Sequence, residues 1–387
     1  MGKNKKLQEL ELALNSLVIF RKLLTNEVVL PLRALLDTDT TDPIIQLRQY
    51  AEFTSRLYQK STNLTEFILK LVLEDDNFYI RQLAAGTEPE SAITACAMNE
   101  LLILQRLSRL RPSELQKEIS YYGVLPEWSV SEIDFREAYA DHAAQLKTRG
   151  FGQYARSLMF MLRDGVITPV QYADSITPDM LAGDFEAQHS VLQNAAALLA
   201  EKPAQNMLLW GDTGCGKSAA VKAAVNQYGK DGLRLIQLTA DQLSELPEVM
   251  AQIAHNPLRF LIFFDDLMFD TPADAGAAMT WLEGAAAAKP ENVILCATAA
   301  NRCLLRGGTP DPATCCAVSG RFGLQIHFER PDEQTYRALV REFASRSGVP
   351  VSEEMLRGAE RYAAEGCGRS PRTARQYIDL LRSGDGR

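Results

Sequence analysis

The sequence predicts an all-helical N-terminal domain, then an α/β domain with a parallel five-stranded sheet, then a small helical lid. Two observations predict this fold class. In the first 165 residues, apolar residues recur three and four positions apart, as they do on amphipathic helices. Beyond residue 187, short uninterrupted apolar runs alternate with helical segments, which is typical of parallel strands buried on both faces.

The composition excludes several classes of protein. The chain has 387 residues, enough for two or three domains, and its 46% hydrophobic and 23% charged residues are ordinary for a globular protein. No apolar run reaches the roughly 18 residues that a membrane-spanning helix needs. Glu9 and Glu11 interrupt the first apolar segment, so we expect no secretory leader and no membrane partner.

Charge and cysteine content bear on partners and location. The formal charge is −8, with 20 basic and 24 acidic residues before Gly183 and 21 and 25 from it onward. Neither half is the basic domain expected of a dedicated nucleic-acid binder, although a local basic patch would still allow DNA binding. Seven cysteines in so long a chain favour reduced thiols over a disulfide framework, so we expect a cytoplasmic protein.

We expect four segments in chain order. Residues 1–165 form the helical N-terminal domain, with the clearest helical periodicity at 7–24, 44–58, 64–73 and 93–110, and they contain no motif that suggests a role. Residues 166–187 form a linker on the nucleotide side. Residues 188–330 form the α/β core, with strands expected at 207–210, 233–238, 260–264, 293–297 and 324–328. Residues 331–387 form the lid.

The strongest motif follows the first of these strands and matches G-x-x-x-x-G-K-[ST], the P-loop. Its residues are Gly211, Asp212, Thr213, Gly214, Cys215, Gly216, Lys217 and Ser218. The glycines let backbone N–H groups point at a phosphate, and the following helix adds the positive end of its dipole. Lys217 supplies a point charge to the β- and γ-phosphates, and the Ser218 hydroxyl is suited to bind Mg²⁺. The motif predicts that the chain binds a nucleoside triphosphate.

Two carboxylates end the buried strand at 260–264. Asp265 is the Walker B candidate that holds Mg²⁺, and Asp266 is the candidate that orients and deprotonates the attacking water. Related proteins use Glu at the second position, so the shorter Asp266 implies slow hydrolysis or a site that closes more tightly. The next strand ends in polar residues, and its tip is expected to bind the γ-phosphate or the water. Thr298 and Asn301 are both candidates for this position, and the spacing does not choose between them.

Taken together, these motifs resemble those of the AAA+ ATPases, and in particular the family called domain of unknown function 815. The resemblance rests on NMLLWGDTGCGKS, LRLIQLT, FLIFFDDLMF, WLEGAAAAKPENVILCAT, SGRFGLQIHF and GRSPRTARQYI, in the order of the family. It extends from about residue 177 to residue 381 and leaves the helical N-terminal half unmatched. It implies ATP hydrolysis with Mg²⁺ to remodel or move a macromolecular partner of unknown identity.

The resemblance implies two further functional residues and an assembly. Arg321 falls where AAA+ proteins place an arginine finger, which reaches the γ-phosphate of a neighbouring subunit, and Arg372 resembles the sensor 2 arginine of the lid. We therefore expect a homo-oligomeric ring, most simply a hexamer, with active sites at subunit interfaces. The segment around Gly183 resembles the stretch that packs on the adenine base.

Several alternatives stay open at this stage. A switch or scaffold that binds ATP and scarcely hydrolyses it is compatible with Asp266 and with the ATAANR segment, whose Asn is displaced by one residue from the family pattern. A DNA-associated loading factor is a further possibility. Cys215 lies in the P-loop at a helix N-terminus, which predicts a reactive thiol, while a small side chain that only fills the loop is the other interpretation. Cys296, Cys303 and their neighbours lack metal-site spacing, so we expect free thiols.

Overall fold

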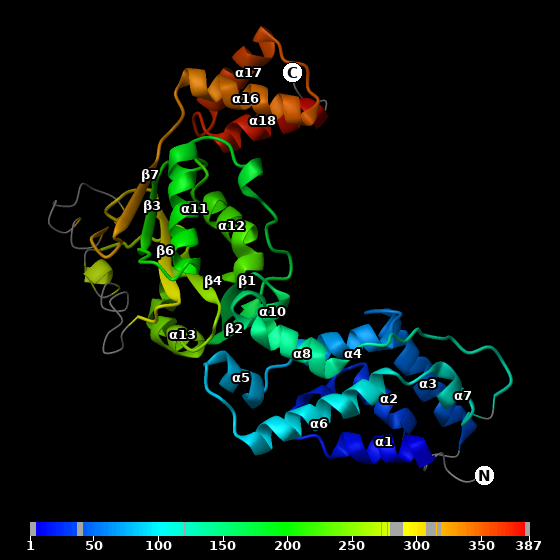
Figure 1. The fold of residues 1–387 in the computed structure, drawn as a ribbon. Helices are drawn as coiled ribbons and strands as arrows, with labels where there is room; N and C mark the ends of the chain where they lie inside the picture. The colour runs from blue at the N-terminus through cyan, green and yellow to red at the C-terminus, as the bar shows by residue number, and fades with distance from the viewer. Residues whose placement is uncertain are drawn as a thin grey trace. The chain divides into compact units, whose positions relative to one another are not determined.

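The computed structural model describes residues 5–36, 42–119, 121–271, 273–276, 278, 289–306, 315 and 319–383. The chain divides into two compact units, Met1–Arg156 and Ser157–Arg387. Figure 1 shows helices throughout the first unit, and a sheet with flanking helices and a helical lid in the second. The predicted fold class is confirmed in outline, but the predicted number of strands in the sheet is wrong.

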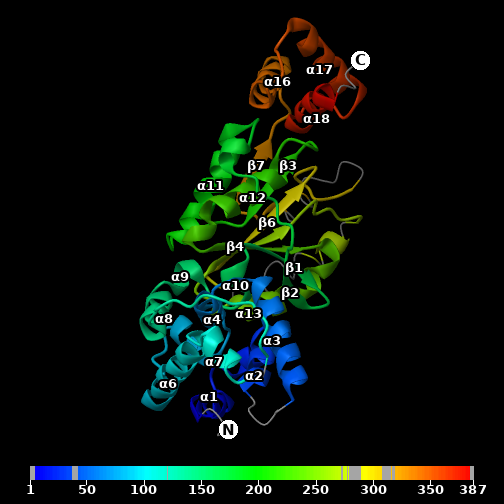
Figure 2. The ribbon, with the colours of Figure 1, turned by 90° about the vertical axis from the view of Figure 1, so that its right-hand side faces the viewer.

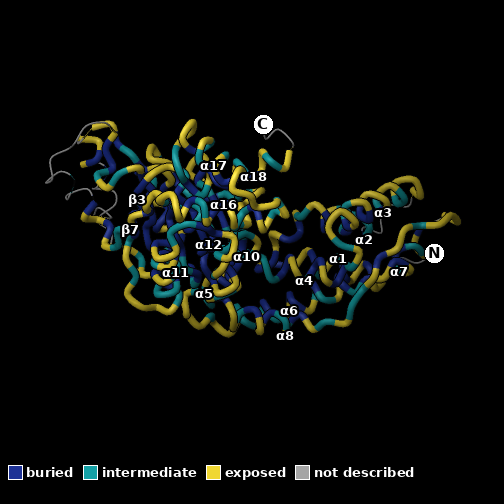
Figure 3. The backbone as a smooth tube through the Cα atoms, turned by 90° about the horizontal axis from the view of Figure 1, so that it is seen from above, coloured by how far each residue is buried: buried dark blue, intermediate teal, exposed yellow. Residues whose placement is uncertain are grey.

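Unit 1 is a bundle of helices around one apolar core. Its described α-helices are α1 (Lys5–Asn15), α2 (Val29–Leu36), α3 (Pro43–Tyr58), α4 (Leu64–Leu73), α5 (Phe78–Ala84), α6 (Ser91–Ser108), α7 (Pro112–Gln116), α8 (Phe135–Ala144), α9 (Leu146–Arg149) and α10 (Gln153–Arg156). Buried and exposed residues alternate along them (Figure 3), as the helical periodicity predicts. Asp42, Asn63 and Asn77 cap the N-termini of α3, α4 and α5 with their side chains.

One predicted helix of unit 1 is shorter than its apolar pattern. The pattern continues over 7–24, but α1 ends at Asn15. The carboxylate of Glu100 on α6 accepts hydrogen bonds from the backbone N–H groups of Val18, Ile19 and Phe20, at 2.7 to 3.2 Å. Those N–H groups would otherwise point to carbonyls of the preceding turn, so a buried acceptor from another helix ends α1 here.

Unit 2 carries a seven-stranded sheet, not the five-stranded sheet that the sequence predicts. The strands are β1 (Met159–Arg163), β2 (Val166–Pro169), β3 (Met207–Gly211), β4 (Leu233–Leu238), β5 (Arg259–Phe264), β6 (Val293–Ala299) and β7 (Leu324–Phe328). Their order is β2-β1-β4-β5-β6-β3-β7, and all pairs are parallel except β1 with β2. The five predicted strands are β3 to β7.

The two additional strands form a hairpin in the segment that the sequence analysis assigns to the end of the helical domain and to the linker. Asp164 and Gly165 form its turn, with φ of 49° and 73°. Positive φ at both central residues is characteristic of the type I′ turn, whose twist matches that of the flanking strands. Asp-Gly is a preferred pair in this turn. The expected domain boundary near residue 165 therefore falls inside the hairpin, whereas the chain divides after Arg156.

The helices of unit 2 flank the sheet and form the lid. Helices α11 (Phe185–Leu199) and α12 (Lys217–Tyr228) share an apolar core with one face of the sheet, and α13 (Leu246–Ile253) links β4 to β5. Helices α16 (Glu333–Ser347), α17 (Glu353–Glu365) and α18 (Pro371–Ser383) pack around a separate small core. Figure 2 shows them as a distinct group that follows β7. Among the described residues, no helix is both long and apolar enough to cross a membrane.

Candidate functional site

The phosphate loop connects β3 to α12, and its glycines are required by geometry. Gly214 and Gly216 have φ of 86° and 99°, a region that favours glycine. A Cβ on Gly211 would lie 2.3 Å from the carbonyl oxygen of Phe328, and one on Gly214 would lie 2.9 Å from Ser370 Oγ. The loop is thus packed between the end of β7 and the lid, with no room for side chains at these positions.

The Lys217 ammonium group lies over this loop. Its Nζ donates to the carbonyl oxygens of Gly211 and Asp212, at 2.6 and 2.8 Å. Burial lowers the pKa of Lys217 from its ordinary value, although the nearby carboxylates of Asp266 and Asp212 oppose the shift. The first helical residue of α12 thus places a cation at the mouth of the phosphate loop.

Two carboxylates and two hydroxyls meet beside the loop. Ser218 Oγ and Thr298 Oγ1 both donate to Asp265 Oδ1, at 2.6 and 2.7 Å. The backbone N–H of Asp266 donates to Thr298 Oγ1 at 2.8 Å. Asp266 has a φ of 55°, which is uncommon for a residue with a side chain and is found most often at functional sites. The carboxyl ends of β5 and β6 are thereby joined to the start of α12.

A cavity of about 460 Å³ contains this cluster. It is lined by Ile176, Met180, Leu181, Ala182, Thr213, Gly214, Gly216, Lys217, Ser218, Ala219, Asp265, Asp266, Thr298, Phe343, Pro371, Arg372 and Arg375. Its polar residues come from the phosphate loop, the strand ends and the start of α18, and most of its apolar ones come from the segment before α11 and from α16. Its size is within the range of small-molecule sites, and a polar part joined to an apolar part suits a nucleotide.

The lid contributes to the same cavity. Arg372 in the first turn of α18 lines it, and the backbone N–H of Arg372 donates to the carbonyl oxygen of Gly214 at 3.4 Å. Of the eight predicted loop residues, five line this cavity: Thr213, Gly214, Gly216, Lys217 and Ser218. The segment that resembles an adenine-binding stretch, GDFEAQHSVLQN from Gly183, does not line this cavity; Leu181 and Ala182, which directly precede it, do.

Two predicted residues lie apart from the cluster. Asn301 holds the turn after β6: its Nδ2 donates to the carbonyl oxygen of Leu305, and its Oδ1 accepts the N–H of Cys303, both at 3.0 Å. Arg321 is exposed and precedes β7, whose last residue pairs with Gly211. Since β3 and β7 are parallel, Arg321 lies at the opposite edge of the sheet from the phosphate loop. Of the two sensor candidates, Thr298 is the one beside the carboxylates.

The cysteines require corrections. Cys215 is only 2% exposed, and burial raises its pKa, which favours a small side chain that fills the loop over a reactive thiol. Cys303 and Cys315 form a disulfide, with their Cα atoms 4.4 Å apart, contrary to the expectation of free thiols. The cysteines therefore give no support to the expected cytoplasmic location. Within the described residues, no group of three His, Cys, Asp or Glu side chains is arranged to hold a metal.

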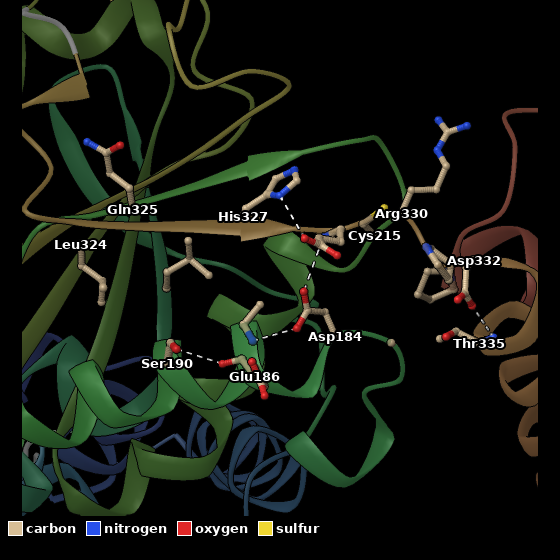
Figure 4. Close-up of a pocket in the computed structure, with 16 residues that line it drawn as sticks. Asp184, Glu186, Ser190, Cys215, Leu324, Gln325, His327, Arg330, Asp332 and Thr335 are labelled. Carbon is tan, nitrogen blue, oxygen red and sulfur yellow. Dashed lines mark hydrogen bonds and ion pairs between the residues drawn. The ribbon is translucent and has the colours of Figure 1, made fainter. Parts of the chain in front are cut away.

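An ion pair at the phosphate loop is not predictable from the sequence. Arg330 Nε lies 2.8 Å from Asp212 Oδ2, although the two residues are 118 positions apart. Arg330 also lines a second cavity of about 570 Å³, shown in Figure 4, together with Asp184, His327 and the buried Cys215. The signal in the sequence is an arginine two residues after the last predicted strand, which by itself names no partner.

Comparison with known proteins identifies the family. The family model described as "Protein of unknown function (DUF815)" matches residues 155–385, more than half of the chain. The chain belongs to the DUF815 family. In this DUF815 chain β6 lies between the P-loop strand β3 and the carboxylate strand β5. No curated protein is similar enough to match.

The solved structures that match this chain are distant. The Holliday junction branch migration motor RuvB of Thermotoga maritima is 14% identical, with a TM-score of 0.39 over 54% of this chain and 64% of that chain. AMPPCP-bound DnaA from Aquifex aeolicus is 17% identical, with a TM-score of 0.39 over 55% of this chain and 66% of that chain. A DNA replication initiation factor is 16% identical, with a TM-score of 0.37. This DUF815 chain thus spans slightly less than two thirds of RuvB and DnaA.

Proposed function

We propose that this protein is an AAA+ ATPase that binds ATP with Mg²⁺ in the 460 Å³ cavity and hydrolyses it. The observation that carries the proposal is the meeting of Lys217, Ser218, Asp265, Asp266 and Thr298 in that cavity. They come from three different elements, α12, the end of β5 and the end of β6, and each supplies a group that phosphoryl transfer requires.

The residues fit a magnesium ion. Ser218 Oγ and Asp265 Oδ1 are 2.6 Å apart and open to the cavity, and hydroxyl and carboxylate oxygens are hard ligands of the kind that Mg²⁺ prefers. Ser218 and Asp265 would hold the ion. When bound, Mg²⁺ would neutralise the negative charge that develops on the β- and γ-phosphate oxygens.

Asp266 is the proposed base. In hydrolysis, the oxygen of a water forms a bond to the γ-phosphorus while the bond to the bridging oxygen of ADP breaks, and Asp266 takes a proton from the water. Its unusual backbone conformation is held by the hydrogen bond from its N–H to Thr298 Oγ1. Thr298 thus fixes the Asp265 carboxylate and the backbone at Asp266, which makes it the preferred candidate to bind the γ-phosphate or the water. Arg372 would meet the phosphates from the lid.

The site is proposed to be shared between subunits. β7 separates Arg321 from the phosphate loop of its own chain by roughly 13 Å, at about 3.3 Å for each strand residue from Leu324 to Phe328. Arg321 would therefore serve the site of a neighbour in a ring, with six subunits as the expected number. A guanidinium suits this role because its charge is permanent and its fork meets two oxygens.

A phosphate-release assay tests hydrolysis against a slow nucleotide switch. We expect steady-state release from the wild-type chain, and a decrease of about 10²-fold or more in Asp266→Asn, because the amide cannot accept the proton. Asn301→Ala is the control, since Asn301 bonds only to its own turn among the contacts described. Release from the wild type that equals release from Asp266→Asn would favour the switch.

A mixing experiment tests the shared site. Arg321→Ala should bind ATP but lose about 10³-fold or more in turnover, the effect of removing a finger supplied in trans. Lys217→Ala should be inactive by itself. A mixture of the two variants should regain activity, because some interfaces then combine an intact pocket with an intact Arg321. Turnover that is independent of protein concentration, with no recovery on mixing, would mean that one chain holds the complete site.

A further inference from the structure

The segment between β7 and α16, residues 329–332, is attached to the ATPase core at two consecutive residues. The backbone N–H of Glu329 donates to Asp184 Oδ2, the carboxylate that caps α11, at 3.4 Å. Arg330 Nε donates to Asp212 Oδ2 in the phosphate loop at 2.8 Å. Figure 4 shows Asp184 and Arg330 at the second cavity, with the Arg330 guanidinium directed away from Asp184. The segment that leads into the lid is thus bonded to the phosphate loop.

Arg330 also lies against the lid. A Cβ on Gly368 would be 2.3 Å from Arg330 Nη1 and 3.0 Å from its Cζ, so the guanidinium occupies the space that this glycine leaves. Gly368 has a φ of 86° and forms the turn before α18, which carries Arg372. One guanidinium therefore lies between the phosphate loop and the turn that starts the last lid helix.

Asp212 is bound from two sides. Its carbonyl oxygen accepts from Lys217 Nζ at 2.8 Å, and its carboxylate accepts from Arg330. Lys217 is the group proposed to meet the phosphates, so a change in its bonds on phosphate binding reaches Arg330 through a single residue. Arg330 also balances the negative charge of the Asp212 carboxylate, which lies in the loop where the phosphates of ATP would bind.

We propose that Arg330 is a positioning residue that couples phosphate binding at the loop to the position of the lid, through Asp212. This inference rests on the proposed function, because the loop must bind ATP for the coupling to matter. A role in folding is not needed to explain the pair: its side chains are 47% and 53% exposed, and exposed ion pairs contribute little to stability. Arg330→Gln should therefore fold.

Hydrogen–deuterium exchange of the full chain, with and without ATP and Mg²⁺, tests the coupling. The measured quantities are the ATP-dependent protection of the loop amides at 212–218 and of the α18 amides. The variants are Arg330→Gln, Arg330→Lys, Asp212→Asn and the double variant Asp212→Asn/Arg330→Gln. The matched control is Arg56→Gln in unit 1, because Arg56 also forms an ion pair, with Glu52, and its side chain is 40% exposed.

We expect ATP to protect both segments in the wild type. In Arg330→Gln the loop should remain protected, with an affinity for ATP within about fivefold of the wild type, while the ATP-dependent protection of α18 decreases by about threefold. Arg330→Lys keeps the charge and should retain most of that protection. The double variant should equal either single variant, because both changes break the same contact. Arg56→Gln should behave as the wild type.

Three results would overturn the inference. Protection of α18 that is equal in Arg330→Gln and in the wild type, with the loop protected in both, would exclude the coupling while leaving ATP binding intact. Additive effects in the double variant, or the same loss in Arg56→Gln, would mean that the effect does not pass through this pair. A wild-type loop that ATP does not protect would contradict the proposed function itself, and the coupling with it.

Discussion

Unit 1 and unit 2 each use carboxylates at key positions, and they use them in different ways. Glu100 in unit 1 is 3% exposed, and its two oxygens accept from the backbone N–H groups of three consecutive residues and from Cys96 Sγ. Asp265 and Asp266 in unit 2 are exposed to a cavity, and both hydrogen bonds to Asp265 fall on one oxygen.

The difference separates a structural carboxylate from a functional one. The bonds of Glu100 join α6 to the end of α1 and leave its oxygens surrounded by protein donors, so no ligand is needed to compensate its charge. The carboxylates of unit 2 are oriented by neighbours yet remain accessible, and Asp266 keeps an uncommon backbone conformation. Groups that are held in place but not saturated are available to bind and to react.

The largest of these expected effects is a loss of stability caused by a substitution in unit 1. Glu100→Ala should lower the free energy of unfolding by about 3 kcal/mol or more, because several buried N–H groups lose their acceptor at once. Denaturant unfolding followed by the fluorescence of Trp128, a buried residue of the same unit, measures this loss. Affinity for ATP should be unchanged. The exposed neighbour Asn99→Ala is the control, and an equal loss in both variants would contradict the role of Glu100.

A substitution at Thr298 in unit 2 should lower the turnover of ATP but leave the affinity for ATP nearly unchanged. Thr298→Val keeps the shape of the side chain but removes the hydroxyl that donates to the Asp265 carboxylate and accepts the backbone N–H of Asp266. We expect a decrease in turnover of roughly tenfold to a hundredfold, with little change in ATP affinity, because orientation is lost while the phosphate loop is intact. A variant with normal turnover would show that Asp265 and Asp266 do not depend on Thr298.

The smallest effect concerns the thiol in the phosphate loop. Because burial raises the pKa of Cys215, iodoacetamide near pH 8 should modify the exposed Cys367 first and Cys215 slowly. Peptide mass spectrometry of a time course measures both rates. Faster modification of Cys215 than of Cys367 would return this position to the reactive thiol that its place at a helix N-terminus predicts.

The sequence predicts some parts of unit 2 and leaves others undetermined. The five predicted strands and the phosphate loop could be located because strands buried on both faces are uninterrupted apolar runs, and because phosphate binding needs glycines and a lysine at fixed spacing. The β1–β2 hairpin is not predicted, because the Pro- and Gly-containing sequence around its Asp164-Gly165 turn is also typical of a linker. Spacing likewise could not separate Thr298 from Asn301, because the choice depends on the turn after β6.

Polar pairs between residues far apart in the chain cannot be predicted from this sequence. Glu100 with residues 18–20, and Asp212 with Arg330, are brought together only by tertiary packing, and neither pair leaves a periodic pattern. Unit 1 as a whole shows this limit: its helices follow from their apolar spacing, but nothing in that spacing states what the unit binds.

The central claim is that the cavity at the phosphate loop binds ATP. Isothermal titration calorimetry of ATP with Mg²⁺ into the wild type and into Lys217→Ala tests it most directly. We predict saturable binding at one site in each wild-type chain and its loss, or nearly so, in Lys217→Ala, because the variant lacks the charge proposed to meet the β- and γ-phosphates. Equal affinity of the two proteins for ATP would contradict the account.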